Sequence, residues 1–146
     1  MQNPNQIYSI KRLGPHIVLV YNDQPITDPE KLATDFLQKI LNKQHLESMQ
    51  FLGNRVRLNK FNNLSEPELH YLIGRYQKRY DSLSSISISV DEKRLRKNRL
   101  IMTGHHETGC CFENHCEIIR GSWRMELCSQ EGEWLVVSLD VEGVDF

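Results

Sequence analysis

The feature that most constrains the fold is a period-two alternation of apolar and polar residues in the last third of the 146-residue chain. Residues 117–128 read EIIRGSWRMELC, and residues 134–143 read WLVVSLDVEG. Successive side chains of a strand point to opposite faces, so this alternation predicts antiparallel strands with one buried face. The predicted buried set is Ile119, Trp123, Met125, Leu127, Leu135, Val137, Leu139 and Val141. The predicted solvent-facing set is Arg120, Ser122, Arg124, Glu126, Cys128, Trp134, Val136, Ser138 and Asp140.

Two more strands are predicted just before these. In residues 85–90 (SISISV), Ile86, Ile88 and Val90 alternate with serines and are expected to share the buried face. Residues 99–106 (RLIMTGHH) follow after a basic stretch. The four segments together predict an antiparallel meander, because antiparallel neighbours can be joined by short turns.

Helical patterns occupy the first half of the chain. Asp28 can cap a helix whose first turn contains Pro29. Its apolar residues recur at helical spacing, at Leu32, Ala33, Phe36, Leu37, Ile40 and Leu41. Residues 44–53 predict a short second helix ending near Gly53, and residues 54–61 (NRVRLNKF) predict a strand.

A third helix is predicted over residues 65–80, where Ser65 and Glu68 form a capping box. Its apolar stripe consists of Leu69, Leu72, Ile73, Tyr76 and Tyr80. Helices followed by a meander predict an α+β domain over residues 28–146. Residues 1–27 are predicted to be an N-terminal extension containing a short hairpin.

Charge and composition narrow the function classes. Eighteen basic residues against 19 acidic ones give a net charge of −1, so there is no global attraction to nucleic acid or membranes. The first residues lack a basic segment followed by an apolar stretch, so no secretory signal is predicted. The four cysteines are therefore expected to be reduced thiols in a cytoplasmic or nuclear protein.

The order of these elements resembles the nuclear transport factor 2-like, or cystatin-like cone, family. The segments that carry the resemblance are 28–52, 55–61, 65–80 and 121–143. In the last of these, a Trp-bearing strand turns through a Gly to a second Trp-bearing strand, like the closing hairpin of the family. The resemblance implies a strongly curved antiparallel sheet wrapped around two or three N-terminal helices, with a pocket or a filled core on the concave side.

The resemblance also implies two kinds of function, since the family contains dehydratases and isomerases as well as non-catalytic dimers that bind proteins or peptides. Family enzymes place an Asp/His pair or an Asp/Arg/Asp set in the cavity. The predicted buried face has no ionisable residue, and no such set stands at matching positions. We therefore predict no catalytic residue, no metal and no cofactor. If the cone holds a ligand, the cavity candidates are Tyr76, Tyr80, Trp123 and His105.

Residues 104–116 (GHHETGCCFENHC) are the densest cluster of metal-binding and nucleophilic side chains. A zinc site needs four ligands, which here would include Cys111 and Cys116 with His106 or His115. The two adjacent cysteines at 110 and 111 argue against it, because neighbours on a strand point to opposite faces. We predict instead a hairpin tip, with turn geometry at Gly109 and Asn114.

A basic stretch, residues 91–99 (DEKRLRKNR), is predicted to be a solvated turn. The alternative is a weak contact with nucleic acid or an acidic partner through Lys93, Arg94, Arg96, Lys97 and Arg99. No aromatic platform flanks the cluster, which weakens the case for single-stranded RNA.

The predicted outer face combines Trp134 and Val136 with Arg120, Arg124 and Glu126, and aromatic residues and Arg are enriched at interfaces. We therefore predict a non-catalytic intracellular interaction or adaptor domain. It would form a homodimer or heterodimer and bind a protein or peptide partner through the sheet face and the cone rim, with no membrane contact. The alternative is a small-molecule-binding enzyme of the dehydratase or isomerase type that uses the cone cavity.

Overall fold

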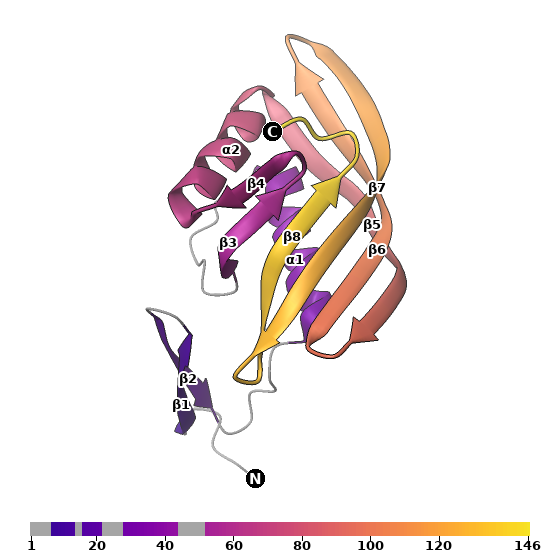
Figure 1. The fold of residues 1–146 in the computed structure, drawn as a ribbon. Coiled ribbons are helices and arrows are strands. Elements are labelled where there is room, and N and C mark those ends of the chain that lie inside the picture. The colour runs from indigo at the N-terminus through magenta and orange to yellow at the C-terminus, as the bar shows by residue number, and fades with distance from the viewer. Residues whose placement is uncertain (1–6, 14–15, 22–27, 44–51) are drawn as a thin grey trace.

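The computed structural model describes residues 7–13, 16–21, 28–43 and 52–146 (Figure 1). The elements, in chain order, are β1 (Ile7–Leu13), β2 (His16–Tyr21), α1 (Pro29–Leu41), β3 (Leu52–Leu58), β4 (Phe61–Leu64), α2 (Glu66–Lys78), β5 (Ser82–Arg96), β6 (Arg99–Phe112), β7 (His115–Gln130) and β8 (Glu133–Val141). The predicted short helix over residues 44–53 lies mostly outside the described residues. Its expected end near Gly53 is wrong, because Leu52 and Gly53 already belong to β3.

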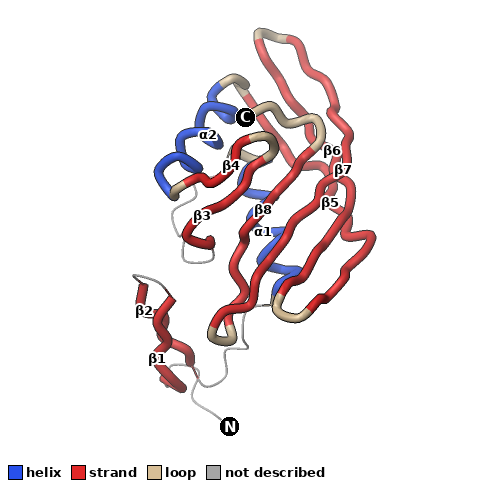
Figure 2. Tube along the Cα trace, in the orientation of Figure 1, coloured by secondary structure: helices blue, strands red, loops and turns tan. Residues whose placement is uncertain are grey.

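Six strands form one curved sheet in the order β4-β3-β8-β7-β6-β5, and β1 pairs with β2 in a separate two-stranded sheet (Figures 1 and 2). Strands β5 to β8 form the predicted antiparallel meander, while β3 pairs parallel to β8. Helix α1 crosses the concave side of the sheet, and α2 lies beside β3 and β4 (Figure 1). The predicted α+β class, with a curved sheet wrapped around helices, is confirmed.

Helix α1 begins where the sequence predicts it. The Asp28 side chain accepts a hydrogen bond from the backbone N–H of Glu30 at 3.0 Å, and Pro29 is the first helical residue. The buried side chains of α1 are Ala33, Phe36, Leu37, Ile40 and Leu41. Because each fully buried large apolar side chain contributes about 1.5–3 kcal/mol, this face holds the helix against the sheet.

Helix α2 begins at the predicted capping box. The Glu68 carboxylate accepts hydrogen bonds from the backbone N–H of Ser65 at 3.0 Å and from its hydroxyl at 2.7 Å. These two bonds lower the pKa of Glu68 below its ordinary value. Four members of the predicted apolar stripe, Leu69, Leu72, Ile73 and Tyr76, are buried, and Tyr80 packs against the core from a partly buried position.

Strand β7 carries the predicted alternation into the core. Trp123, Met125 and Leu127 are buried on the concave face, and Ile119 packs against the core from a partly buried position. The Trp123 indole N–H donates to the carbonyl of Ser89 on β5 at 3.1 Å, across the intervening strand β6. A buried indole N–H without a partner would be costly, so this bond matters for the packing of the tryptophan.

Strand β8 departs from the prediction because it contains a β-bulge. Ser138 pairs with Glu126, but the next pair on β7 is Leu127 with Val136, so Val137 is an extra residue. The bulge reverses the alternation on its N-terminal side. Val136 is consequently 0% exposed, and Trp134 packs against the core. Their predicted placement on the outer face is wrong.

Strand β5 contains two similar irregularities, between Ser85 and Ser87 and between Val90 and Glu92. Ile88 and Val90 face the core as predicted, whereas Ile86 turns outward and is 53% exposed. The basic stretch predicted to be a turn is also mostly strand. Strand β5 continues to Arg96 and β6 begins at Arg99, so the turn itself is only two residues long.

The segment predicted as one strand at residues 54–61 is divided by a tight turn between β3 and β4. Asn59 in this turn has φ +51° and supports it with its side-chain amide. Its Nδ2 donates to the carbonyls of Val141 at 3.3 Å and Val144 at 2.8 Å, while its Oδ1 accepts from the Val141 N–H at 2.7 Å. Asn59 therefore ties the β3–β4 turn to the C-terminal end of β8.

Candidate functional site

The cluster at residues 104–116 belongs to a long β6–β7 hairpin. The strands run to Phe112 and resume at His115, and only Glu113 and Asn114, both at positive φ, form the turn. Asn114 is therefore a turn residue as predicted. Gly109 is not, because it pairs with Ile118 within the strands.

Cys111 and Cys116 face each other across this hairpin and form a disulfide, with Cα atoms 4.1 Å apart. This differs from the expectation of four reduced thiols, while Cys110 and Cys128 are free. Both sulfurs considered as zinc ligands are consumed by the disulfide. Across the described residues, no group of three or more His, Cys, Asp or Glu side chains is placed to hold a metal ion.

The two adjacent histidines of β6 lie on opposite faces of the sheet. His105 is on the outer face, exposed, with its Nδ1 2.5 Å from the Asp91 carboxylate. Its predicted position in the cavity is wrong, because the even-numbered residues of β6 are the ones that face the core. His106 is 1% exposed, and its Nε2 must donate to the Glu142 carbonyl at 2.7 Å, since a carbonyl only accepts. Its Nδ1 lies 2.9 Å from the Thr108 hydroxyl, so both ring nitrogens have hydrogen-bond partners.

The aromatic cavity candidates are part of the core or its rim. Trp123 and Tyr76 are each 2% exposed, and the Tyr76 ring packs 5.6 Å from the rings of Tyr80 and Phe146. Burial raises the pKa values of both Tyr76 and Tyr80, so both hydroxyls stay protonated at neutral pH. Neither tyrosine is activated as a base.

A hollow of about 560 Å³ lies where the C-terminal end of α2 approaches the β6–β7 turn, at the mouth of the cone. Its lining residues are Lys78, Arg79, Tyr80, Phe112, His115 and Glu117. Of these residues, only Tyr80 is a cavity candidate from the sequence pattern. The other hairpin residues could have been found only from the register, which pairs Phe112 with His115 and Cys110 with Glu117.

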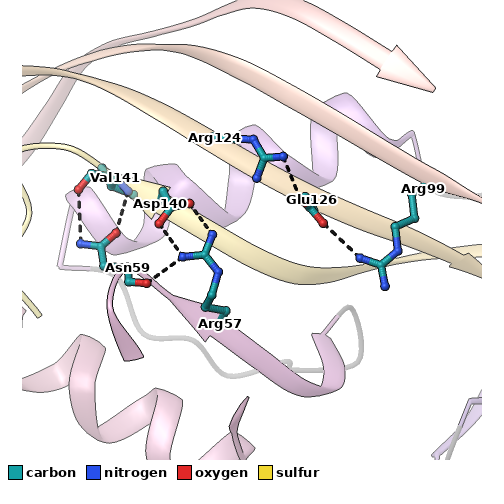
Figure 3. A network of polar contacts seen from close by, with 7 residues as sticks. All are labelled: Arg57, Asn59, Arg99, Arg124, Glu126, Asp140 and Val141. Atoms are coloured by element: carbon teal, nitrogen blue, oxygen red, sulfur yellow. Dashed lines mark hydrogen bonds and ion pairs between the residues drawn. The ribbon is translucent and has the colours of Figure 1, made fainter. Parts of the chain in front are cut away.

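The outer face of the sheet carries a network of ion pairs (Figure 3). Arg57 of β3 forms two hydrogen bonds with the carboxylate of Asp140 on β8, one of them at 2.8 Å, and Asp140 raises the pKa of this guanidinium. Glu126 of β7 accepts from Arg124 at 2.9 Å and from Arg99 at 3.0 Å. Arg124 and Glu126 therefore lie on the outer face as the alternation predicts.

The same outer face extends across β5, β6 and β7. Arg120 lies 3.5 Å from Glu107 on β6. Two exposed isoleucines flank Gly109: Ile86 of β5, 53% exposed, and Ile118 of β7, 49% exposed. A Cβ atom at Gly109 would lie 3.8 Å from the Ile86 Cδ1, so the glycine leaves space between the two side chains. We call Ile86, Gly109 and Ile118 the isoleucine patch.

Another hollow, of about 550 Å³, has Asp91, His105, Ser122, Arg124 and Asp140 among its lining residues, together with the apolar Trp123 and Val141. The basic residues proposed for an acidic partner lie near the β5–β6 turn. Lys93 pairs with Glu30 of α1 at 2.9 Å and Arg99 pairs with Glu126, whereas Arg94, Arg96 and Lys97 are exposed. Their contact with a nucleic acid or acidic partner stays a prediction.

Comparison with known proteins places the fold. No protein-family model and no curated protein matches the sequence. Solved structures do match: the LinA-type3 hexachlorocyclohexane dehydrochlorinase of Novosphingobium barchaimii has a TM-score of 0.61 at 13% identity, covering 80% of this chain and 90% of that chain. The Kfla4162 protein of Kribbella flavida gives 0.62 at 7% identity, covering 78% and 91%. An NTF2-like protein of Cytophaga hutchinsonii gives 0.51 at 10%, covering 79% and 98%.

The curved sheet, its strand order and these matches together define the class: the chain has the nuclear transport factor 2-like fold. The resemblance inferred from the sequence is thus confirmed at the level of fold. None of the described helices is both long and apolar enough to span a bilayer.

Proposed function

We propose that this protein is an interaction domain that self-associates through the outer face of β5, β6 and β7. The observation that carries the proposal is the isoleucine patch, a pair of large apolar side chains exposed on the sheet surface beside charged residues of both signs. Apolar anchors surrounded by a polar rim are the usual anatomy of a protein interface.

The charges around the patch support a second copy as the partner. Arg120 of β7 lies beside Glu107 of β6, and Arg124 lies beside Glu126 on β7 itself. A surface that carries both signs can be complementary to itself under a two-fold axis, which is the commonest symmetry of soluble oligomers. A standard interface removes about 800 Å² from each partner. That area is roughly a tenth of the 8940 Å² accessible surface of this chain.

The filled interior also favours a non-catalytic role. Side chains of α1 and the sheet, among them Phe36, Met102 and Met125, occupy the concave side and are 1% exposed or less. Among the described residues, the buried imidazole there is that of His106, which has partners for both nitrogens. General acid–base catalysis needs a group within hydrogen-bond reach of a substrate proton, and His106 does not supply one.

Sedimentation of the Ile118→Asp variant tests the proposal. We expect the wild-type protein to form a dimer and Ile118→Asp to weaken it at least about tenfold in Kd, because a buried carboxylate would oppose an identical one across the axis. Leu95→Asp is the matched control, since Leu95 is 64% exposed but lies at the far end of β5. A wild-type monomer at high concentration, or equal dimerisation of both variants, would contradict the proposal.

A second candidate function, binding of a small aromatic acid, is favoured by the hollow at the cone mouth. Two aromatic rings, Tyr80 and Phe112, and two cations, Lys78 and Arg79, line its 560 Å³ volume. Ligand pockets of about 300–1,000 Å³ with a few convergent polar groups are typical of small-molecule sites. A structural neighbour is a dehydrochlorinase, which adds support for a small-molecule role.

Titration with benzoate and naphthoate, followed by NMR of the His115 ring, tests this candidate. We expect saturable shifts of the His115 signals in the wild type. Phe112 is half-exposed in the structure, and its replacement in Phe112→Ser removes one of the two aromatic rings of the hollow, so the shifts should no longer saturate in this variant. Shifts that do not saturate, or that persist in Phe112→Ser, would exclude the site.

A further inference from the structure

A separate groove lies at the opposite edge of the sheet from β5, between edge strand β4 and helix α2. It has a volume of about 370 Å³ and a mostly apolar lining, formed by Phe61, Leu64, Pro67, Glu68, Tyr71 and Leu72. Tyr71 is 66% exposed, which is more than any other large apolar or aromatic side chain among the described residues. An exposed aromatic ring beside an open apolar groove is unfavourably hydrated in the free protein. A partner that covers the ring and the groove removes this apolar surface from water, which favours binding.

Two cations flank the aromatic rings of this groove. The Arg75 guanidinium lies 5.9 Å from the ring centre of Phe61 and 5.8 Å from that of Tyr71, and Lys60 Nζ lies 5.6 Å from the Phe61 ring. Arg75 also donates to the backbone oxygen of Phe146, which orients the guanidinium. For Lys60, no carboxylate of the described chain lies within ion-pair distance. Its charge is available to a partner.

The acidic residue of the groove, Glu68, already has a cation beside it. Glu68 accepts from Ser65 and lies 3.7 Å from Arg55. The electrostatic preference of the groove is therefore set by Lys60 and Arg75, which attract a carboxylate placed beside the aromatic rings. The complementary ligand combines an apolar ring with a negative charge.

The backbone beside the groove favours an extended peptide over a small molecule. Strand β4 pairs with β3 along one side only, and within the described residues its other side has no strand partner. An exposed strand edge presents N–H and C=O groups that an extended peptide can satisfy by adding a strand. The groove then receives one side chain of that peptide.

We propose that the β4–α2 groove binds an extended segment of a partner protein in which an aromatic or proline residue is adjacent to an acidic residue. The ring packs between Phe61 and Tyr71, and the acidic side chain faces Lys60 and Arg75. The groove lies at the other edge of the sheet from the isoleucine patch, so peptide capture and self-association use different surfaces. A dimer of this chain would present two such grooves.

Selection from a random octapeptide library displayed on phage tests the proposal without knowledge of the partner. We expect enriched sequences to contain Phe, Tyr, Trp or Pro next to Asp or Glu. Enriched peptides, made synthetically with a fluorescent label, are then measured by anisotropy against the wild type and two variants. Tyr71→Ser should weaken binding at least about tenfold, as loss of a central aromatic anchor does. Lys60→Glu should weaken it and reduce its dependence on salt concentration.

Two matched controls separate the groove from general effects. Leu95→Ser removes a large exposed side chain of similar exposure, 64%, at the opposite end of the sheet. Lys97→Glu reverses an exposed charge in the β5–β6 turn. Both should bind the peptides as the wild type does. All variants should keep the wild-type sedimentation behaviour, which makes failure of the groove distinguishable from failure of the dimer.

Three outcomes would overturn the proposal. The first is the absence of any enriched sequence, and the second is enrichment of basic or purely aliphatic peptides. The third is enrichment of the expected peptides whose binding is equal in Tyr71→Ser and Leu95→Ser. Any of these would mean that the groove is not the peptide site.

Discussion

Replacing Gly104 by Ala tests the close approach of β5 and β6 beside the buried Trp123 indole. A Cβ atom at Gly104 would lie 1.8 Å from the Ser89 carbonyl oxygen and 2.8 Å from Trp123 Nε1. The same carbonyl accepts the hydrogen bond of the buried Trp123 indole. The methyl group therefore cannot be placed without moving β5 away from β6.

The cost has two parts. Forcing an extra carbon into a packed site costs about 1–3 kcal/mol, and the loss of the Trp123–Ser89 bond adds about 1 kcal/mol. The Gly104→Ala variant should thus lose roughly 2–4 kcal/mol of unfolding free energy, which lowers the urea midpoint by about 1–2 M at a slope of about 2 kcal/mol/M.

Gly74→Ala is the matched substitution with the opposite expectation. Gly74 lies inside α2, and nothing is within 4 Å of the position that its Cβ would take. Alanine should stabilise this helix by about 0.5–1 kcal/mol. Urea denaturation followed by tryptophan fluorescence measures both variants. If Gly104→Ala unfolds within about 0.5 kcal/mol of the wild type, the two strands are not as close as described.

Three further predictions concern local contacts. Asn59→Ala should lower the unfolding free energy, measured by urea denaturation, by about 2–3 kcal/mol, because it removes three hydrogen bonds and leaves alanine at a positive φ. An effect no larger than that of a surface substitution would mean that Asn59 does not tie the β3–β4 turn to β8. The pKa of Glu68 is lowered on folding, so its stabilising effect is present above its unfolded pKa near 4.5 and is lost as the pH falls through the folded pKa. Glu68→Gln should therefore lower Tm at pH 7 more than at pH 3, and equal shifts would contradict the capping box. Cys116→Ser should lower the unfolding free energy by about 2 kcal/mol, because it opens the short loop closed by the disulfide. Treatment of the wild type with a dithiol should lower its Tm to that of Cys116→Ser. Cys128→Ser should change neither the unfolding free energy nor the Tm, because Cys128 is a free thiol.

The sequence predicts those features of the fold that depend on residues within a single strand or helix. The caps at Asp28 and Ser65 work locally, and both helices begin where these residues predict. Strand β7 keeps its alternation from Ile119 to Leu127, so its buried face is predicted correctly. These features depend on neighbours within one element.

The features that were predicted wrongly depend on the register between strands. Val137 is the bulge residue of β8, and neither its residue type nor its sequence neighbours distinguish it from a regular strand residue. His106 rather than His105 faces the core because β6 takes its phase from its neighbours, with His106 opposite Gly121. The disulfide likewise follows from the two-residue turn that places Cys111 opposite Cys116, which the sequence does not specify alone.

The mouth of the cone illustrates the same limit for function. Tyr80 belongs to the helical stripe and was identified from its spacing, but Phe112 and His115 reach the hollow only through the hairpin register. The groove at β4 combines residues of α2, which the sequence predicts as a helix, with residues of β4, which the sequence does not predict as a separate strand. A site assembled from several elements is visible only after the elements have been placed together.

The bulge in β8 has a consequence for comparing this protein with its structural neighbours. A single additional residue at Val137 means that positions before it and after it are offset by one when matched to an uninterrupted strand. In such a pairing without a gap, Trp134 would be equated with a solvent-facing position of the other protein. Substitution patterns gathered across this strand should therefore be interpreted in two separate blocks, joined at a one-residue insertion.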